Sequence, residues 1–393
     1  MRHFLQSEAW QRFQQALGKE VISQRGHGWS FMGVIEQPRK RGGRLNRRLY
    51  LPYGPTCQDE IALGEALQAI RKIANQKKVV YVRLEPIILS GQTIDLKKYG
   101  CQPNKHPTQP DRTWVLNLAK DEENLLANMS GTNRNLWNTH KNKGLSFQID
   151  YDKTDLKDFL AMLHAMAGRK GLKTHDDSYF KTMARSLFPE KDAGLAIALL
   201  HDKPIVAAIF FDDPVAGIRY YAHAGSFEEA RKIQANSPLL TFLILDAKKR
   251  GFKEFDFYGV SPPGDELHRW AGHSKFKRSF GGVDKEYLGT WELPVRRDLF
   301  ILAQVARKFS KLDLRKAPSS PDRLTSAANS FSSLDVPPGT SPSDKTVFAR
   351  ADSSWERGIL RKSSKPLAKA SGSKVVFKGI IKRGDTRGGK ATD

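Results

Sequence analysis

The pattern of apolar and polar positions predicts helices that alternate with short strands along most of the chain. Apolar residues recur at helical spacing over residues 7–17, with Ser7 as a predicted N-cap, and again over residues 58–74. A longer helical tract over residues 121–143 begins with acidic residues, ends with basic ones and stops at Gly144, which suits the helix dipole at both ends. Short apolar runs between these tracts predict strands at 29–35, 48–51 and 79–84.

The same alternation continues beyond Gly144. Predicted strands lie at 145–151, 194–201, 204–211, 218–223 and 254–258, and predicted helices lie at 154–168, 178–187 and 238–250. Strands mixed with helices, twice over, predict a mixed α/β (α+β) chain with two domains of similar build. We place the first domain at residues 1–146 and the second at residues 147–315. No exact internal repeat is present, and one large domain is the alternative.

The composition changes after about Lys316. Residues 316–393 are dense in Ser, Pro, Gly, Lys and Arg and contain few aliphatic side chains. Such a segment cannot bury enough apolar surface to offset the entropy lost on ordering, so we predict a disordered basic tail there.

The formal net charge of +23 over 393 residues is the largest signal in the composition. An excess of this size predicts attraction to a polyanion, and nucleic acid, an anionic membrane surface and a phosphorylated substrate all qualify. Charge alone does not choose among them. The two cysteines, Cys57 and Cys101, lack paired spacing and have no His cluster beside them, so neither a disulfide framework nor a zinc site is expected.

The N-terminal residues are polar and amphipathic and do not resemble a secretory signal. No apolar run reaches the roughly 20 residues that a membrane-spanning helix needs. We therefore expect a cytoplasmic protein whose contact with the anionic inner face of the plasma membrane, if present, is peripheral.

The sequence contains no Walker loop, no HExxH and no convincing GxSxG element, so nothing in it announces a covalent nucleophile or a catalytic metal. The segment richest in chemistry runs from residue 254 to residue 290. A predicted strand ends at Tyr258 and Gly259, and Phe276 and Lys277 follow a Pro- and Gly-containing loop. A fixed positive charge beside an aromatic face, at a strand end that opens into a cleft, suits an RNA 3′ end and a developing oxyanion. A solvent-exposed basic loop is the alternative.

The segment resembles the C-terminal signature of the FemABX family, in which a strand with Asp-Phe-x-Gly precedes Phe-Lys-x-x-Phe-Gly-Gly. The resemblance covers almost the whole predicted folded part in the family's order and spacing, and it ends before the predicted tail. The other elements that carry it are Gln6-Ser7-x-x-Trp10, Tyr50-Leu51-Pro52-Tyr53-Gly54-Pro55, Arg83-Leu84-Glu85-Pro86, Gln109-Pro110, Arg134 through Gly144, and Tyr220-Tyr221-Ala222-His223-Ala224-Gly225-Ser226.

The resemblance implies two tandem acetyltransferase-like (GNAT-like) domains. Members with a helical-hairpin arm carry it in the second domain, but residues 226–247 leave no room for one, so the chain is similar to the armless, FemX-like layout. The implied activity is transfer of an amino acid from aminoacyl-tRNA to the stem-peptide amine of a peptidoglycan precursor, either lipid II or UDP-MurNAc-pentapeptide, which builds the interpeptide bridge. Aminoacyl-tRNA is then a co-substrate, and no metal or organic cofactor is expected.

The resemblance also implies roles for individual residues. Lys277 is expected to hold the aminoacyl-tRNA end and to stabilise the tetrahedral intermediate, with Phe276 as a stacking face for a base. Glu85 is expected near the acceptor, where it could orient the attacking amine or accept its proton. A buried ion pair is the alternative for Glu85, and a surface lysine is the alternative for Lys277.

Five further residues are candidates for substrate binding. Arg219 and His223 lie four positions apart near a strand end, and this even spacing predicts both side chains on one sheet face. Similar enzymes carry an Arg and a Tyr at this spacing to hold the precursor's diphosphate and sugar, although here the second residue is His223. An ordinary salt bridge is the alternative for Arg219. Tyr258 is a candidate cleft wall, and Tyr221 is a candidate substrate-binding residue. Arg39 lies in a basic loop where relatives carry a phosphate contact.

Two other classes of function fit the same observations. One is an acyl-CoA-dependent N-acyltransferase on a GNAT-like scaffold. The other is a basic protein that binds RNA, or a membrane surface, without catalysis. Transfer of an amino acid from charged tRNA would distinguish the expected aminoacyltransferase from both of these alternatives.

Overall fold

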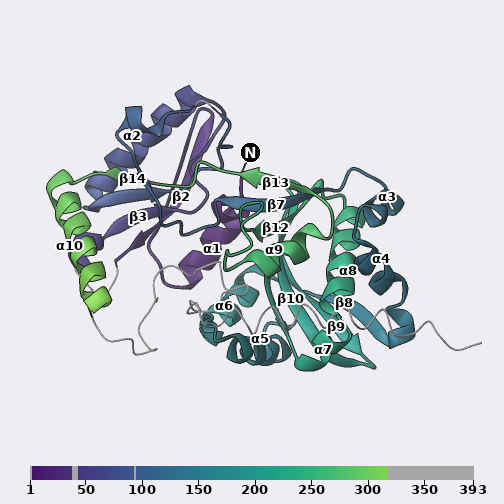
Figure 1. Ribbon diagram of the computed structural model, residues 1–393. Coiled ribbons are helices and arrows are strands. Elements are labelled where there is room, and N and C mark those ends of the chain that lie inside the picture. The colour runs from purple at the N-terminus through teal and green to yellow at the C-terminus, as the bar shows by residue number, and fades with distance from the viewer. Residues whose placement is uncertain (1, 38–42, 93, 317–393) are drawn as a thin grey trace, which may run out of the picture. The chain divides into compact units, whose positions relative to one another are not determined.

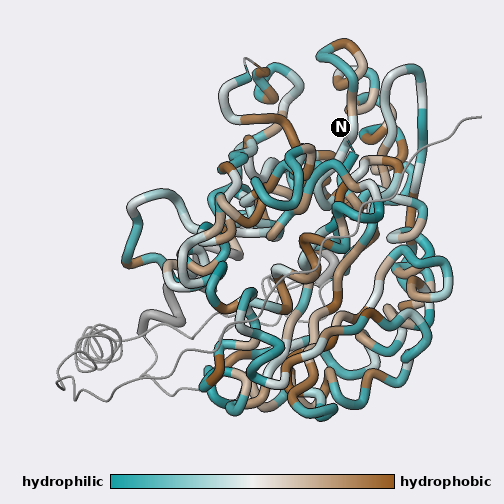
Figure 2. The backbone as a smooth tube through the Cα atoms, turned by 90° about the vertical axis from the view of Figure 1, so that its right-hand side faces the viewer, coloured by the Kyte–Doolittle hydropathy of each residue, from teal (hydrophilic) through white to brown (hydrophobic). Residues whose placement is uncertain are grey.

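The computed structural model describes residues 2–37, 43–92 and 94–316, and these residues form two seven-stranded mixed sheets with helices packed on them (Figure 1). Hydrophobic stretches run through the interior strands and helices, and hydrophilic stretches follow the outer loops (Figure 2). The predicted tail, residues 317–393, and Arg39 lie outside the described residues.

The first sheet has the strand order β1-β2-β3-β5-β14-β6, with β4 paired to β2. Its strands are β1 (Val21–Gly26), β2 (Trp29–Glu36), β3 (Arg48–Leu51), β4 (Thr56–Cys57), β5 (Tyr81–Leu84), β6 (Gln102–Asn104) and β14 (Thr290–Pro294). Helix α2 (Glu60–Gln76) begins at Asp59, whose carboxylate accepts a hydrogen bond from the amide of Ala62. The apolar side of α2, which includes Leu67 and Ile70, packs on this sheet.

The second sheet has the strand order β13-β7-β12-β11-β10-β9-β8. Its strands are β7 (Arg112–Asn117), β8 (Leu145–Asp150), β9 (Ala193–Leu200), β10 (Lys203–Asp213), β11 (Ile218–Ser226), β12 (Glu254–Gly259) and β13 (Val283–Glu286). Helices α5 (Lys157–Lys170) and α6 (Asp177–Leu187) cover one face, and α8 (Asn236–Lys249) covers the other. Both faces are therefore buried, and the central strands β10 and β11 are apolar along nearly their whole length.

The remaining elements are shorter or lie outside the two sheets. They are η1 (Phe4–Gln6), α1 (Glu8–Ala16), η2 (Gly43–Asn46), η3 (Leu96–Tyr99), α3 (Glu122–Ala127), α4 (Gly131–Asn138), η4 (Lys141–Lys143), α7 (Glu228–Lys232), α9 (Ala271–Arg278) and α10 (Arg297–Lys316). Between β11 and β12 the described chain holds only α7 and α8, which agrees with the expected absence of a helical-hairpin arm.

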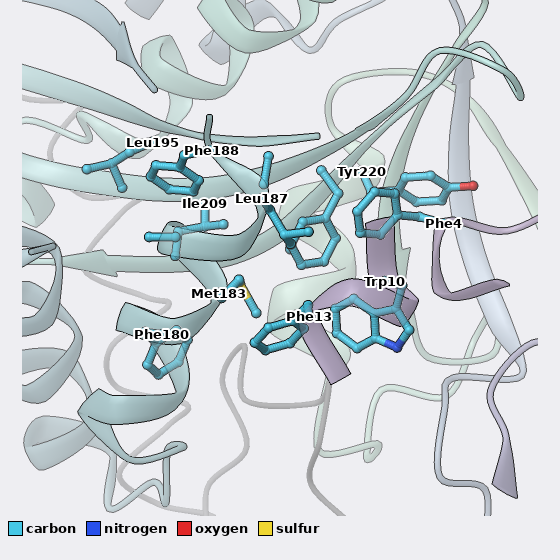
Figure 3. Close-up of a cluster of buried hydrophobic side chains, with 14 of the residues drawn as sticks. Phe4, Trp10, Phe13, Phe180, Met183, Leu187, Phe188, Leu195, Ile209 and Tyr220 are labelled. Carbon is cyan, nitrogen blue, oxygen red and sulfur yellow. The ribbon is translucent and has the colours of Figure 1, made fainter. Parts of the chain in front are cut away.

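The N-terminal segment η1–α1 shares one hydrophobic core with both sheets. Ser7 accepts a hydrogen bond from the amide of Trp10 at 3.1 Å, which confirms the predicted N-cap. The ring of Phe4 stacks on Phe211 of β10 at 4.6 Å, and Trp10 and Phe13 continue this apolar surface toward α6 (Figure 3). Met32 of β2 belongs to the same core. The segment therefore sits where the two sheets meet.

The strands of the two sheets do not follow the predicted boundary near residue 146. Strand β7 precedes that boundary yet pairs with β12 and β13, and β14 follows it yet pairs with β5 and β6. Periodicity in a sequence shows which faces of a strand are apolar, but it does not identify the strand's partner. The boundary drawn from the sequence remains a prediction about domains, and the sheets exchange strands across it.

The tract over residues 121–143 is not the single helix that its periodicity predicts. It divides into α3, α4 and the short η4. Ser130 is the cause, because its hydroxyl accepts a hydrogen bond from the amide of Asn133 and so begins a new helix. The other predicted helices and strands are present with shifts of a few residues.

Candidate functional site

The carboxylate of Glu85 is the centre of a buried polar cluster at the end of β5. It accepts hydrogen bonds from the Tyr50 hydroxyl at 2.6 Å, the Thr290 hydroxyl at 2.6 Å, the Thr108 amide at 2.7 Å and the Gln109 amide at 3.2 Å. We call these five residues the Glu85 cluster. They come from β3, β5, β14 and the segment before β7, so the cluster ties four parts of the chain together.

The four donors match the acceptor sites that a carboxylate offers. Glu85 is only 4% exposed, and burial raises its pKa, while the hydrogen bonds from Thr290 and Tyr50 act in the opposite direction. Because its oxygens are occupied by donors from the chain itself, the geometry favours a positioning role for Glu85 over direct contact with a substrate. The expected alternative, a buried ion pair, is not what surrounds the carboxylate, because the groups that donate to it are hydroxyls and backbone amides.

The orientation of Gln109 follows from the Glu85 cluster. The Tyr50 hydroxyl gives its one proton to Glu85, so its oxygen can only accept, and the Gln109 amide group donates to it at 3.1 Å. The NH₂ end of Gln109 therefore faces Tyr50. Its carbonyl oxygen, Oε1, has no hydrogen-bond partner among the described residues, although the side chain is 97% buried. A buried acceptor left in this state costs roughly 1–3 kcal/mol.

A pocket of about 290 Å³ lies against Gln109 and Tyr50. Trp10 of α1 and Tyr179 of α6 also line it, and the ring of His175 stacks on Tyr179 at 3.9 Å. We call this the aromatic pocket. Its lining comes from both sheet regions and from the N-terminal helix, so its shape depends on the shared core.

A second pocket of about 880 Å³ is lined by Arg2, Arg12 and Arg25, and we call it the arginine-lined pocket. Leu5 lines the aromatic pocket and Gln6 lines this one, so η1 separates the two. Each arginine is held by a carboxylate, as Arg2 is by Asp213 at 2.7 Å.

Two buried atoms of the arginine-lined pocket residues, Arg2 Nε and the Thr56 hydroxyl, have no partner among the described residues. One is an obligatory N–H donor and the other can donate. Both atoms are closed off from solvent, so neither of them is a donor that faces the open space of the pocket.

The end of β12 departs from regular strand geometry. Tyr258 has a φ of 62°, in the left-handed region, and the pairing of β12 with β7 shifts between Asp256 and Gly259. Asp256 accepts hydrogen bonds from the Tyr258 amide and the Thr113 hydroxyl. Burial raises the pKa of Asp256 to about 6. A side chain at Gly259 would overlap Pro110, since an added Cβ would lie 2.6 Å from its ring.

Lys277 on α9 is buried at this strand end and does not line the open cleft that the sequence predicts. Lys277 is only 2% exposed, and its ammonium donates a hydrogen bond to the carbonyl oxygen of Gly259 at 2.7 Å. Phe276 is half-buried and packs edge-on against Phe280 at 5.2 Å. Tyr258 is also buried and packs near His3, with ring centroids 5.7 Å apart. The structure thus brings Lys277 and Tyr258 to one strand end, in a closed arrangement.

Arg219 and His223 do not share a sheet face, so the prediction from their spacing is wrong. A bulge in β11 skips Ala222 in the pairing with β10 and reverses the alternation between the two residues. Arg219 points to the side of α8, where it stacks over Phe210 at 4.2 Å. His223 points to the other side, with its ring 5.2 Å from Phe180.

Arg219 is completely buried in an ionic cluster inside the second sheet's core. It contacts Asp212 at 2.7 Å and Asp246 at 2.6 Å, and neither partner is on a pocket lining described above. His223 is 1% exposed, and burial lowers its pKa to about 3, so it is neutral. Tyr221 is buried in the core beneath α8. These three residues are therefore buried inside the fold, and none of them lines either pocket.

Several residues that line the two pockets are ones that the sequence singles out least. Tyr50 and Gln109 lie in segments that carry the family resemblance, but the sequence indicates no role for either side chain. Arg2 and Arg12 carry no signal in the sequence beyond their charge. Among the described residues, no group of three or more His, Cys, Asp or Glu side chains is arranged to hold a metal ion. No described helix is both long and apolar enough to cross a membrane.

The model of the FemAB family matches residues 95–209 and 201–308. The chain belongs to the FemAB family. This confirms the family resemblance and, with it, the expected class of enzyme, a transferase. A lipid II:glycine glycyltransferase of Staphylococcus haemolyticus is 25% identical over 331 residues, which cover 65% of this chain and 79% of that protein. One from Staphylococcus saprophyticus is 24% identical over 159 residues, or 38% of each chain.

Solved structures agree with the family at the level of the fold. The crystal structure of FemX has a TM-score of 0.68 and 17% identity, and the match covers 76% of this chain and 94% of that one. The structure of L-PGS from Bacillus licheniformis has a TM-score of 0.51 and 13% identity over 77% of this chain and 94% of that one. The expected fold class, a mixed α/β chain with the FemX layout, is confirmed.

Proposed function

We propose that this FemAB-family chain transfers an amino acid from aminoacyl-tRNA to the stem-peptide amine of a peptidoglycan precursor, lipid II or UDP-MurNAc-pentapeptide. Two comparisons support the proposal: the relatives are named lipid II:glycine glycyltransferases, and the fold is that of FemX. The observation that carries it is the Glu85 cluster, because it fixes the lining of the aromatic pocket beside a second, cation-lined pocket.

The proposed reaction needs little beyond positioning. The lone pair of the acceptor amine attacks the ester carbonyl carbon, and a C–N bond forms to give a tetrahedral oxyanion. The C–O bond to the terminal ribose of the tRNA then breaks, the released ribose oxygen gains a proton and the new amide nitrogen has lost one. The ester is already activated, so alignment of the two substrates and stabilisation of the oxyanion supply the catalysis.

The arginine-lined pocket is the proposed site for the precursor's diphosphate. Guanidinium groups bind phosphate oxygens through paired donors, and three arginines line this pocket. A volume of about 880 Å³ accommodates a diphosphate with part of its sugar. Because Arg2 is already paired with Asp213, a bound phosphate would share this arginine with the carboxylate.

Lys277 remains the proposed group for the donor end of the reaction. In the ligand-free chain its ammonium is engaged by the Gly259 carbonyl, so donor binding must redirect that contact toward the developing oxyanion. Phe276, half-buried on the same helix, is the proposed stacking face for the terminal base. Glu85 is proposed as a positioning residue that holds Gln109 and Thr108.

The proposal is tested by incubating the purified chain with pools of charged tRNA and each precursor, followed by mass spectrometry. A gain of one amino-acid residue on a precursor, abolished by ribonuclease treatment of the donor, is the expected result. A gain with acetyl-CoA in the absence of tRNA would instead identify an acyl-CoA-dependent N-acyltransferase. Tight tRNA binding without any gain would favour an RNA-binding protein.

A further inference from the structure

Helix α10 carries an apolar surface that the described chain leaves open. Ile301, Leu302 and Val305 are 58%, 54% and 42% exposed. Val305 lies four positions after Ile301 and three after Leu302, so the three side chains are neighbours on one side of the helix. Single exposed apolar residues are ordinary on protein surfaces, but a group of large ones on one helix indicates an interaction surface. We call these three residues the α10 apolar face.

A different side of α10 holds the helix on the protein. Phe300 and Ala303 are buried, and Phe300 packs against Val80 and Tyr81, with its ring centroid 5.5 Å from that of Tyr81. The helix lies beside the first sheet, at an outer edge of the described chain (Figure 1). Because α10 is attached to the sheet through Phe300 and Ala303, the α10 apolar face is not needed for this attachment.

The charge around the α10 apolar face is positive. The sequence of α10, RDLFILAQVARKFSKLDLRK, contains six Lys or Arg residues and two Asp residues. Arg296 and Arg297, where the helix begins, are both exposed. The helix also packs beside η2, and the sequence that leads into η2, residues 39–44, contains four basic residues and no acidic one. Apolar side chains among positive charges are typical of a helix that lies in the headgroup layer of an anionic membrane.

The same charges disfavour other occupants of this helix face. A second copy of the chain would bring one cationic helix against another, and residues 317–393 are themselves rich in Lys and Arg. RNA bases would bind by stacking on aromatic rings, but the α10 apolar face is aliphatic. An anionic lipid surface matches both the charge and the aliphatic side chains.

We propose that α10 docks this protein on an anionic bilayer surface. The α10 apolar face enters the boundary between headgroups and acyl chains, and the exposed Arg296 and Arg297 lie among the lipid phosphates. None of the three apolar residues lines either pocket described above, so this surface is separate from the candidate functional site. The inference goes beyond the proposed function and does not depend on the transfer reaction.

The test is sedimentation of the full chain with lipid vesicles. One set contains phosphatidylglycerol and phosphatidylcholine in equal amounts, and the other contains phosphatidylcholine alone. We expect the native protein to bind the anionic vesicles at least about tenfold more tightly than the neutral ones, because several cations contact the lipid phosphates. Added salt should weaken this binding, since it screens those contacts.

A triple variant tests the α10 apolar face itself. Ile301→Ser, Leu302→Ser and Val305→Ser combined should weaken binding to the anionic vesicles at least about tenfold, because the apolar area that enters the bilayer is lost.

The matched control also removes three exposed apolar side chains, but scattered ones. It combines Ile61→Ser, Val215→Ser and Leu267→Ser, at positions that are 78%, 81% and 88% exposed. This control variant should bind the vesicles like the native protein.

A second measurement leaves the α10 apolar face apolar. Leu302→Trp should dock normally, and lipids with brominated acyl chains should quench the fluorescence of the added indole, because it lies within the bilayer. Val215→Trp is the control, and its added indole should not be quenched.

Four results would overturn the inference. They are absence of native binding to the anionic vesicles, equal binding to the neutral vesicles, native binding by the α10 triple variant, and an unquenched indole in Leu302→Trp. A native dimer in lipid-free solution that the α10 triple variant converts to a monomer would assign the face to a second copy instead. None of these measurements uses tRNA or a precursor, so their outcome is independent of whether the protein transfers an amino acid.

Discussion

Two buried charged clusters, around Glu85 and around Arg219, differ in what lies beside them. Both charged groups are nearly or fully buried, and each has several partners from distant parts of the chain. The partners of Arg219 are carboxylates and apolar rings that face the interior of the second sheet. The partners of Glu85 include Tyr50 and Gln109, which line a pocket. A buried charge thus indicates a site only when its partners reach a cavity.

The largest expected effect comes from removing the charge of the structural cluster. Arg219→Met would leave Asp212 buried without its arginine and Asp246 paired with Arg250 alone, and we expect a loss of about 3–5 kcal/mol in the free energy of unfolding. Denaturant titration measures this change. Arg250→Met is the matched control, because Arg250 also contacts Asp246 but is 40% exposed, and it should cost under about 1 kcal/mol.

The structural role of Arg219 would be contradicted if Arg219→Met remained as stable as the native protein and instead raised the KM for the precursor. That result would show that Arg219 binds the acceptor and does not stabilise the fold.

The next effect concerns Asp256, at the end of β12, whose pKa is raised to about 6 by burial. The folded state holds the proton of the Asp256 carboxyl more tightly than the unfolded state does, so this protonated group stabilises the fold. Its contribution to the free energy of unfolding is complete below about pH 4 and is lost as the pH rises through about 6. We expect Asp256→Asn to flatten the decline in stability over this range by up to about 3 kcal/mol.

Thermal or denaturant unfolding at several pH values measures the slope for Asp256. Asp155→Asn, at an exposed position, is the control and should leave the slope unchanged. An unaltered slope in Asp256→Asn would show that other groups set the pH dependence.

A smaller effect on stability, but a selective one on activity, is expected for Tyr50→Phe. The change removes one donor from Glu85 and the hydroxyl that accepts a hydrogen bond from the Gln109 NH₂ group, which should cost about 1 kcal/mol. Because Gln109 then loses its fixed orientation, the KM for the precursor should rise severalfold while the KM for the tRNA substrate stays constant. Tyr99→Phe removes a hydroxyl that donates to the carbonyl of Glu60, and it is the control. Equal changes in both KM values would contradict the assignment of this cluster to the acceptor.

The smallest effect on stability is expected at the arginine-lined pocket. Arg12 is 47% exposed and pairs with Asp192, so Arg12→Gln should change the free energy of unfolding by less than about 1 kcal/mol. It should nevertheless weaken binding of the precursor, more strongly at low than at high salt, because the lost contact is to a diphosphate. Arg185→Gln, at an exposed position of α6, is the control for the lost charge. An unchanged affinity at all salt concentrations would remove the diphosphate from this pocket.

The local elements of the fold could be predicted from the sequence, whereas their pairing could not. Apolar periodicity placed α2, α6, β9, β10 and β12 closely, because burial of one face or both faces determines which positions are apolar. The exchange of β7 and β14 between the sheets depends on contacts between residues far apart in the sequence, and no local pattern records them.

The candidate site shows the same limit at the scale of side chains. Glu85 could be selected because the family resemblance implies an acidic residue near the acceptor, but the donors that occupy it come from three other segments. Arg219 and His223 were assigned to one face by a rule that a single bulged residue reverses. Burial of Lys277 beneath a loop at the end of β12 depends on tertiary packing that its basic sequence neighbourhood does not indicate.

We propose above all that the Glu85 cluster holds the acceptor side of an aminoacyl-transfer site. It is tested most directly by measuring transfer from charged tRNA to the precursor with native protein and with Glu85→Gln, each with the two KM values. We expect the native protein to add one residue, and Glu85→Gln to raise the KM for the precursor about tenfold while leaving that for the tRNA substrate unchanged. Absence of transfer by the native protein, or a Glu85→Gln variant with native kinetics for both substrates, would contradict the claim.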